Sequence, residues 1–306
     1  MPAANERAQL IERIRKSSSV LEPIPTGMPA LLDKPQPIRA VVFDIYGTLF
    51  VSGSGDVGTH AATDSAHALT EAMLAAGVHG EPAAGKRGVQ LLDQAIEAAH
   101  EQRRSEGVAF PEVDIRVIWQ QVLQTLAEEE IIRWHTGRRV ELGKAVFNVA
   151  VEYECRVNPV WPMPSLAEVL AALREREMRL GLVSNAQFVT PLLFEAFLGR
   201  PYEDLGFTGD FCRFSYRMLE AKPSRRAYEE VAEALADRGV ERHEILYVGN
   251  DVRNDVEPAA AVGFKTALFA GDKRSLRLRE GDPHVQGVKP DLVLTDLKQL
   301  LEVVAG

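Results

Sequence analysis

The segment Arg39–Asp44 is a short apolar run that ends in an acid, and it constrains the fold more than any other feature of the chain. A run without polar alternation is typical of a strand buried on both faces of a parallel sheet. Similar runs recur late in the chain, at residues 180–184, 245–249, 265–269 and 291–294. Helical patterns separate them, at residues 166–176, 225–238 and 256–262. This alternation predicts an α/β fold, with a parallel sheet and helices on both faces.

The pattern of hydrophobic residues changes between Gly53 and about Arg156. Four segments there carry apolar residues at helical spacing without any buried-strand run, at residues 63–76, 88–104, 114–130 and 138–153. We therefore expect an all-helical domain over residues 54–159, inserted into a core formed by residues 37–53 and 160–306. A glycine-rich joint at Gly53–Gly58 and a proline-rich joint at Asn158–Pro164 flank it, and we expect them to act as hinges.

Residues 1–36 read as an appendage. Glu6–Lys16 is predicted to form one amphipathic helix with Leu10, Ile11 and Ile14 on one face, and the prolines at 23–37 then interrupt regular structure. We expect this segment to dock onto the body or onto a partner chain, which leaves a homo-oligomer open, in preference to a membrane surface.

Charge and composition exclude several classes of protein. The net charge of −9 argues against a general nucleic-acid binder, because phosphate backbones are held by dense Lys/Arg faces. No apolar run approaches the roughly 20 residues of a membrane span, and the first 19 residues lack the apolar block of a signal peptide. Cys155 and Cys212 have no metal-type spacing, so we expect a cytoplasmic protein without a disulfide framework.

Polar residues follow the predicted strands at the points where the strands end. Phe43–Leu49 (Phe-Asp-Ile-Tyr-Gly-Thr-Leu) and Val183–Asn185 follow two of them, Lys222-Pro223 opens a helix, and Gly249–Asp255 (Gly-Asn-Asp-Val-Arg-Asn-Asp) follows the next strand. Ligands of parallel α/β sheets sit beyond the carboxyl ends of the strands. We therefore expect these four segments to meet in one site.

In this order and at these spacings the four segments resemble the motifs of the haloacid dehalogenase superfamily, over roughly residues 38–300 if the inserted helices count as its cap. The resemblance implies a Rossmann-like core with a helical cap, and a hydrolase that acts on small phosphorylated metabolites. It implies Asp44 as the nucleophile that forms an aspartyl phosphate. It further implies that the Ser184 hydroxyl and the Asn185 N–H hold the phosphoryl oxygens and that Lys222 bridges nucleophile and phosphate.

The resemblance also implies a Mg²⁺ site, formed by the carboxylates of Asp44, Asp251 and Asp255 and the backbone carbonyl of Tyr46. Charge counting supports a metal separately, because three carboxylates and Lys222 leave the empty site near −2 and a divalent cation cancels that excess. In the alternative interpretation Asp251 and Asp255 only cap a helix that begins near Asn254.

Tyr46 departs from the phosphatase pattern, which places a second aspartate two residues after the nucleophile as general acid and base. A phenol with a pKa of about 10 is a poor base near neutrality. The tyrosine version resembles the 2-haloacid dehalogenases, whose halide leaving group needs no proton. These enzymes work without metal and carry an arginine early in the cap, whereas residues 61–85 contain none and the first is Arg87. We therefore favour phosphate chemistry.

Two further interpretations of this position stay open. Tyr46 either takes part in catalysis or only packs over the end of the sheet. If it slows turnover enough, the chain would be a catalytically weak binding protein that works through its N-terminal appendage. The retained charges at Asp44, Lys222, Asp251 and Asp255 argue against a pure scaffold.

Overall fold

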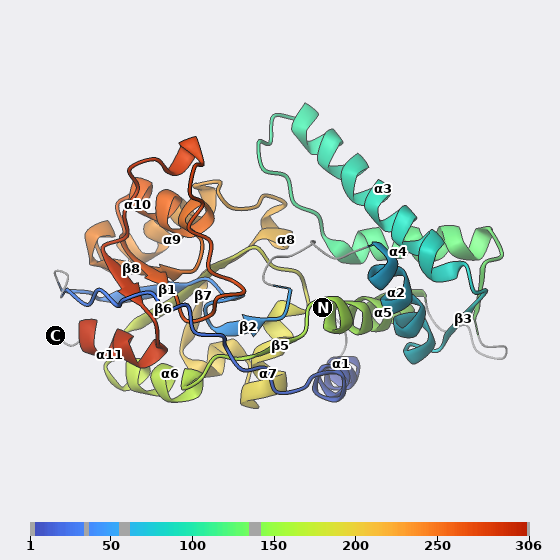
Figure 1. The fold of residues 1–306 in the computed structure, drawn as a ribbon, viewed down its shortest axis with the longest axis horizontal. Coiled ribbons are helices and arrows are strands. Elements are labelled where there is room, and N and C mark those ends of the chain that lie inside the picture. Colours follow the sequence, from blue (N-terminus) through green and yellow to red (C-terminus); the bar gives the residue numbers. More distant parts are fainter. Residues whose placement is uncertain (1–3, 34–36, 55–61, 135–141, 305–306) are drawn as a thin grey trace.

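A computed structural model describes residues 4–33, 37–54, 62–134 and 142–304 (Figure 1). Its centre is a six-stranded sheet in the order β10-β9-β8-β1-β6-β7. All neighbouring strands pair in parallel, which confirms the predicted α/β fold. The strands are β1 (Ala40–Phe43), β6 (Arg179–Ser184), β7 (Phe207–Phe214), β8 (Ile245–Gly249), β9 (Lys265–Phe269) and β10 (Leu292–Leu294).

Side chains of β1 alternate between two hydrophobic clusters, as a strand covered on both faces requires. Val41 and Phe43 belong to one cluster, and Ala40 and Val42 to the other. The helices of the core are α6 (Leu166–Glu175), α7 (Thr190–Leu198), α8 (Ser215–Met218), α9 (Arg226–Ala236), α10 (Glu257–Val262) and α11 (Leu300–Val303). A single π-turn, Val252–Val256, precedes α10, so this helical segment begins four residues before the predicted helical pattern at 256–262 and two before the alternative start near Asn254.

The sequence patterns miss strand β7. Its residues Thr208, Gly209 and Asp210 interrupt the apolar pattern, and Gly209 and Asp210 are exposed. The strand lies at the edge of the sheet, with only β6 as a neighbour. An edge strand is covered less completely than a central one, so it does not need a continuous apolar run.

The inserted region lies in the chain between β2 (Phe50–Ser52) and β5 (Val160–Pro162) and forms the right-hand part of Figure 1. Its helices are α2 (Ala62–Ala75), α3 (Ala84–Ser105), α4 (Ile115–Glu128) and α5 (Leu142–Val157). The expectation that it is all-helical is wrong in one respect. A two-stranded antiparallel ribbon, β3 (Val78–Gly80) with β4 (Ile132–Trp134), joins its helices, and strands of three residues are too short to show a hydrophobic period.

The two chain crossings between core and insertion run side by side. Strands β2 and β5 pair antiparallel, and the Gly53 N–H donates to the Pro159 carbonyl at 2.7 Å. Of the predicted glycine hinge, residues 55–58 lie outside the described residues. A second connection, which the sequence does not reveal, joins the insertion to the core. The Ala221 N–H donates to the Phe110 carbonyl at 2.8 Å, directly before Lys222.

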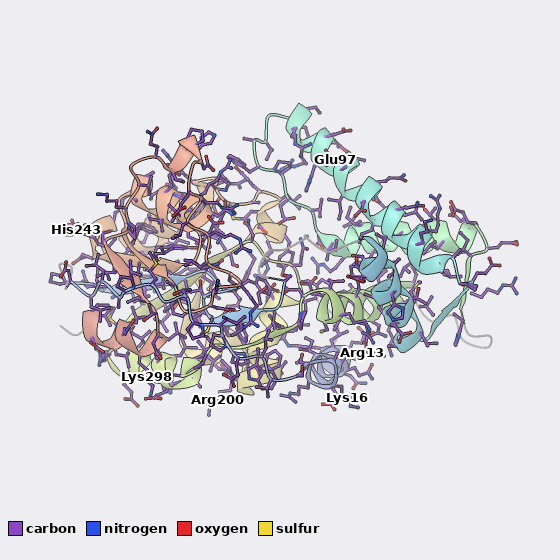
Figure 2. The ribbon with its side chains drawn as sticks, in the orientation of Figure 1. Arg13, Lys16, Glu97, Arg200, His243 and Lys298 are labelled. Carbon is purple, nitrogen blue, oxygen red and sulfur yellow. The ribbon has the colours of Figure 1, made fainter. Side chains whose placement is uncertain are left out.

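Helix α1 (Ala4–Ser17) buries Leu10, Ile11 and Ile14 and packs against α5 and α7. Arg13 of this helix, which is labelled in Figure 2, donates to Glu152 of α5 at 2.6 Å. The segment that follows runs along the core, where Leu31 pairs with Val293 of β10. No helix within the described ranges has both the length and the apolar content needed to cross a membrane.

Candidate functional site

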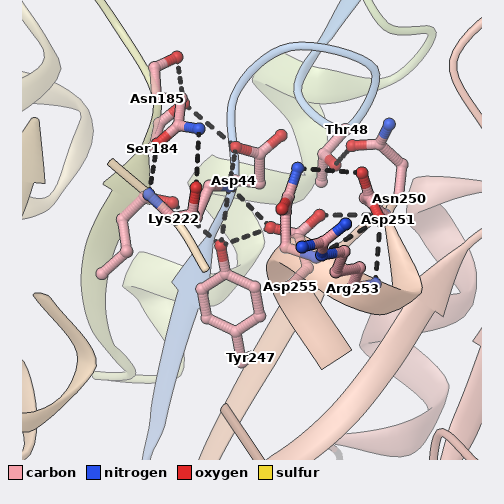
Figure 3. Close-up of polar contacts among 12 residues, drawn as sticks. Asp44, Thr48, Ser184, Asn185, Lys222, Tyr247, Asn250, Asp251, Arg253 and Asp255 are labelled. Carbon is pink, nitrogen blue, oxygen red and sulfur yellow. Dashed lines mark hydrogen bonds and ion pairs between the residues drawn. The ribbon is translucent and has the colours of Figure 1, made fainter. Parts of the chain in front are cut away.

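The carboxyl ends of β1, β6 and β8 bring the predicted residues together (Figure 3). Asp44 follows β1 and is buried, with 5% of its surface exposed. Its Oδ1 accepts from Ser184 Oγ at 3.0 Å and from Lys222 Nζ at 2.6 Å. Neither bond uses Oδ2, and no hydrogen bond from another described side chain reaches it. One oxygen of the carboxylate is thus held in place while the other stays available to react.

Lys222 connects two carboxylates in the interior. Its Nζ donates to Asp44 Oδ1 and to Asp255 Oδ1, both at 2.6 Å, and its side chain is only 6% exposed. Burial opposes the charged amine, but the carboxylates of Asp255 and Asp44 outweigh it and raise the pKa of Lys222. The amine is therefore protonated at neutral pH.

Two neighbours fix Lys222 in this position. Asn185 Oδ1 accepts from the Lys222 backbone N–H at 2.8 Å, so the side chain of Asn185 anchors the backbone of Lys222. The Tyr247 hydroxyl donates to Asp255 Oδ1 at 3.1 Å and lies 3.4 Å from Lys222 Nζ. Because the amine and both carboxylates are held from several elements, the charge arrangement is preorganised.

Asp255 points into the protein from the turn after β8. Its Oδ2 accepts from the Asp251 N–H at 2.9 Å. Burial raises the pKa of the Asp255 carboxyl, and the charge of Lys222 counteracts this rise. The carboxylate packs directly against Gly249, where any side chain would collide with it. The glycine at the end of β8 is therefore required by the position of Asp255.

The Asp251 carboxylate has two sets of structural partners, and the sequence predicts only the capping of the turn that follows it. Its Oδ1 accepts from the Arg253 and Asn254 N–H groups at 2.9 and 3.3 Å, so it caps the turn that follows. Arg279 also binds the carboxylate with two nitrogens, at 2.6 Å through Nη2 and 3.1 Å through Nε. The capping role that was an alternative for Asp251 is thus present, together with an ion pair.

The four predicted metal ligands do not fit a Mg²⁺ ion as they stand. Oδ1 of Asp255 is paired with Lys222, and the Asp251 carboxylate is paired with Arg279. Oδ2 of Asp44 and Oδ2 of Asp255 lie outside these ion pairs, and the latter accepts from the Asp251 N–H. Within the described ranges, no three Asp, Glu, His or Cys side chains gather as metal ligands. The charge argument from the sequence also changes, because Arg279 adds a positive charge beside Lys222 and reduces the excess from −2 to −1.

Tyr46 lines the same cavity as Asp44, but the partner of its hydroxyl lies on helix α7. The hydroxyl shares a hydrogen bond with Thr190 Oγ1 at 2.9 Å. Burial and then the nearby carboxylate of Glu154 raise the pKa of the Tyr46 phenol far above its usual value. This arrangement favours packing over acid–base catalysis for the side chain.

Glu154, near the end of α5, is a polar residue that the sequence patterns do not reveal. Burial raises the pKa of its carboxyl to about 7, and the Asn158 amide partly counteracts this rise. Asn158 in turn accepts from Ser52 Oγ of β2 at 2.7 Å. The joint between core and insertion therefore contains a carboxyl group that changes charge near neutral pH.

A small cavity of about 80 Å³ opens at these strand ends. Besides the predicted residues, Arg277 from the loop after β9 lines it. An arginine in an irregular loop gives no motif, so neither Arg277 nor Arg279 could be placed from the sequence. The full lining comprises Asp44, Tyr46, Ser52, Asn185, Lys222, Asn250, Asp251, Asn254, Asp255 and Arg277.

The parallel sheet, the insertion after its first strand and the centre of aspartate, serine and lysine at the strand ends define a hydrolase of the α/β class. The chain belongs to the haloacid dehalogenase-like hydrolases, whose family model matches residues 38–263. It is 28% identical over 236 residues to the phosphoglycolate phosphatases of Salmonella typhimurium LT2 and Escherichia coli K12, which covers 76% of this chain and 81% of each relative.

A structural comparison agrees on the fold. A 2-haloacid dehalogenase from Pseudomonas syringae pv. Tomato DC3000 superposes with a TM-score of 0.52 at 19% identity, over 87% of this chain and 98% of that one. The phosphoglycolate phosphatase of Photorhabdus laumondii extends the sequence match to 279 residues at 25% identity, over 87% of this chain and 92% of the relative.

Proposed function

We propose that this hydrolase is a phosphatase of small phosphorylated metabolites that works through an aspartyl phosphate on Asp44. The carrying observation is the state of the Asp44 carboxylate, whose Oδ1 is fixed by Ser184 and Lys222 while Oδ2 accepts no bond from a described side chain. A nucleophile needs this combination of fixed orientation and an available lone pair.

The chemistry proceeds in two displacements at phosphorus. Asp44 Oδ2 forms a bond to phosphorus as the bond to the ester oxygen breaks, and the leaving alkoxide takes up a proton from water. A water molecule then attacks the phosphorus of the aspartyl phosphate, which releases inorganic phosphate and restores the carboxylate. Lys222 and the Ser184 hydroxyl are placed to stabilise the phosphoryl oxygens in both steps. The family resemblance implies the same role for the Asn185 N–H.

The relatives named phosphoglycolate phosphatase support phosphate as the group that is transferred. The cavity of about 80 Å³ favours a compact substrate. We propose that residues 54–159 act as the cap that closes over the core formed by 37–53 and 160–306, and that residues 1–36 stay docked on this body. We further propose a cytoplasmic location.

Mg²⁺ is the cofactor that the family resemblance implies, and we propose that it binds beside Asp44. In the present arrangement Asp251 would have to leave Arg279 before it could act as a metal ligand. Binding of the ion is therefore expected to compete with this ion pair, which gives the proposal a direct test.

A 2-haloacid dehalogenase is the second candidate, and two observations favour it. Tyr46 occupies the position of the usual second aspartate. Arg277 lines the cavity and is an arginine, the residue that dehalogenases carry early in the cap and that residues 61–85 of this chain lack. In that reaction Asp44 would displace halide from carbon 2, and water would then hydrolyse the resulting ester.

One panel separates the two candidates. Purified protein is incubated with 2-phosphoglycolate, ethyl phosphate and 2-chloropropionate, each with Mg²⁺ and with chelator, and released phosphate and chloride are measured. We expect phosphate release that Asp44→Asn abolishes. Chloride release without phosphate release would reject the phosphatase.

A further inference from the structure

The loop between α3 and α4 of the insertion is fastened to the core segment that leads into Lys222 (Figure 1). The Ala221 N–H donates to the Phe110 carbonyl at 2.8 Å. Two residues further along the loop, the Glu112 N–H donates to the Leu219 carbonyl at 3.2 Å. An antiparallel bridge lies between these two bonds. The insertion therefore holds the backbone of the residues directly before Lys222.

The Glu112 side chain extends this connection to α8 and to the segment after β6. Its Oε2 accepts from Ser215 Oγ at 2.9 Å. Its Oε1 accepts from Gln187 Nε2 at 3.3 Å and from the Val113 N–H at 2.8 Å. Ser215 is buried, and its Oγ in turn accepts from the Ala186 N–H at 2.9 Å. Both oxygens of one carboxylate from the insertion thus hold groups beside the catalytic end of β6.

Gln187 strengthens the same connection from the side of the core. Its Nε2 also donates to the Val113 carbonyl at 2.8 Å, and its Oε1 accepts from the Ile115 N–H at 3.0 Å. Both ends of this side-chain amide are therefore bound to the insertion where α4 begins. The backbone N–H of Gln187 donates to Thr190 Oγ1 at 3.2 Å, the group that shares a hydrogen bond with the Tyr46 hydroxyl. The segment after β6 is thus tied to the insertion by side chains from both domains.

The two core segments held in this way carry Asn185 and Lys222. Each of these residues is the direct neighbour of a residue whose N–H is held by the contacts just described. The Lys222 N–H donates to Asn185 Oδ1 at 2.8 Å, and Lys222 Nζ lies 2.6 Å from Asp44 Oδ1. Glu112 itself lies outside the lining of the cavity. Hydrogen bonds therefore connect the insertion to the nucleophile through residues that position it.

We infer that Glu112 is a positioning residue of the active site, through which the insertion holds Asn185 and Lys222 in place beside Asp44. The inference rests on the proposed function, because it takes Asp44 and Lys222 to carry out the reaction. It gives the insertion a part in the chemistry in addition to covering the site. A misplacement of about 1 Å caused by a distant substitution can cost about 100-fold in rate, so loss of this contact should be visible in kcat.

Three variants test the inference by kinetics. Glu112→Ala removes both acceptors, so kcat on 2-phosphoglycolate should fall about 10- to 100-fold while KM stays within about threefold. In Glu112→Gln the amide can replace both oxygens, because the Ser215 hydroxyl can turn to the Ala186 carbonyl 3.2 Å away and accept from the amide nitrogen. This variant should keep kcat within about threefold of wild type. Asp114→Ala removes a carboxylate of the same loop that caps α4 and pairs with Arg116, and should also preserve kcat.

Hydrogen exchange followed by mass spectrometry gives a readout that does not depend on activity. In Glu112→Ala, the peptides that contain residues 186–187 and 221–222 should exchange about two- to tenfold faster, the range for loss of one hydrogen bond. Strand β8 should keep its wild-type rate, because a local contact and not the whole fold is lost. Ser215→Ala breaks the link between Glu112 and Ala186 by removing one oxygen, and it replaces Glu112→Ala if that variant does not fold.

Other outcomes overturn the inference. A kcat for Glu112→Ala within about threefold of wild type would remove Glu112 from positioning. An equal loss in Asp114→Ala, or faster exchange that includes β8, would show that Glu112 only stabilises the fold. If wild type does not hydrolyse 2-phosphoglycolate, the proposed function fails, and hydrogen exchange decides the inference separately. Faster exchange confined to the two segments supports it, and unchanged exchange rejects it.

Discussion

Replacing Lys222 by methionine should destabilise the protein strongly, because it leaves two buried carboxylates without their shared cation. Lys222 Nζ lies 2.6 Å from both Asp44 Oδ1 and Asp255 Oδ1, and the three side chains are at most 7% exposed. Removing one partner of a buried ion pair typically costs about 3–5 kcal/mol. We expect a loss of this size in the free energy of unfolding, measured by urea denaturation at pH 8.

The pH dependence identifies the cause of that loss. Without the amine, the folded-state pKa of Asp255 should rise further above its unfolded value, because Lys222 no longer counteracts the effect of burial. A carboxyl whose pKa is raised by folding destabilises the protein as pH increases through that range, so the variant should lose less at pH 5 than at pH 8. Adding Asp255→Asn to Lys222→Met should recover about 1 kcal/mol or more, because one uncompensated charge is gone. A loss below 1 kcal/mol, or an equal loss at both pH values, would refute the buried charge arrangement.

Three further predictions concern the groups around the nucleophile. Tyr46→Phe should cost about 1 kcal/mol of stability through the lost bond to Thr190, and kcat should stay within about threefold of wild type; a hundredfold fall would restore a catalytic role for the hydroxyl. Glu154→Gln should stabilise the protein at pH 8 and not at pH 5. The pKa of the Glu154 carboxyl is about 7 in the folded state against 4.5 for an ordinary glutamate, so ionisation of the carboxyl costs the folded state up to about 3 kcal/mol. Urea denaturation that gives the same stability difference at both pH values would contradict this. Arg279→Gln should tighten Mg²⁺ binding about two- to fivefold in calorimetry by freeing Asp251 from an ion pair, whereas unchanged binding would mean that the pair does not compete with the metal.

The sequence predicts those parts of the fold that bury continuous apolar runs. Strands β1, β6, β8 and β9 are visible for this reason, since central strands of a parallel sheet need apolar residues on both faces. Strand β10 is an edge strand, but all three of its residues are buried and apolar, so it is visible as well. Strand β7 is missed because it lies at the edge, and the ribbon of β3 and β4 because three residues show no period. The helices of the insertion are predicted from their apolar spacing.

The site is predictable only where its residues stand at strand ends. Asp44 and Ser184 come together because neighbouring parallel strands end at the same edge, and Lys222 joins them as the motif order implies. The partner of Asp251 is not predictable in this way. Arg279 lies 28 residues further along, in a loop with no pattern, and its ion pair removes one expected metal ligand from the set.

The measurement that tests the central proposal most directly is a rapid acid quench during turnover of 2-phosphoglycolate, followed by mass spectrometry of the peptide that contains Asp44. We predict a phosphoryl group on Asp44 that forms and decays at rates consistent with turnover and is absent from Asp44→Asn. The same experiment in ¹⁸O-labelled water should place the label in the released phosphate, because water attacks phosphorus. An unmodified peptide throughout productive turnover would contradict covalent catalysis at this residue. Label found instead in the Asp44 carboxylate during turnover of 2-chloropropionate would show that water attacks an ester carbon and that the enzyme is a dehalogenase.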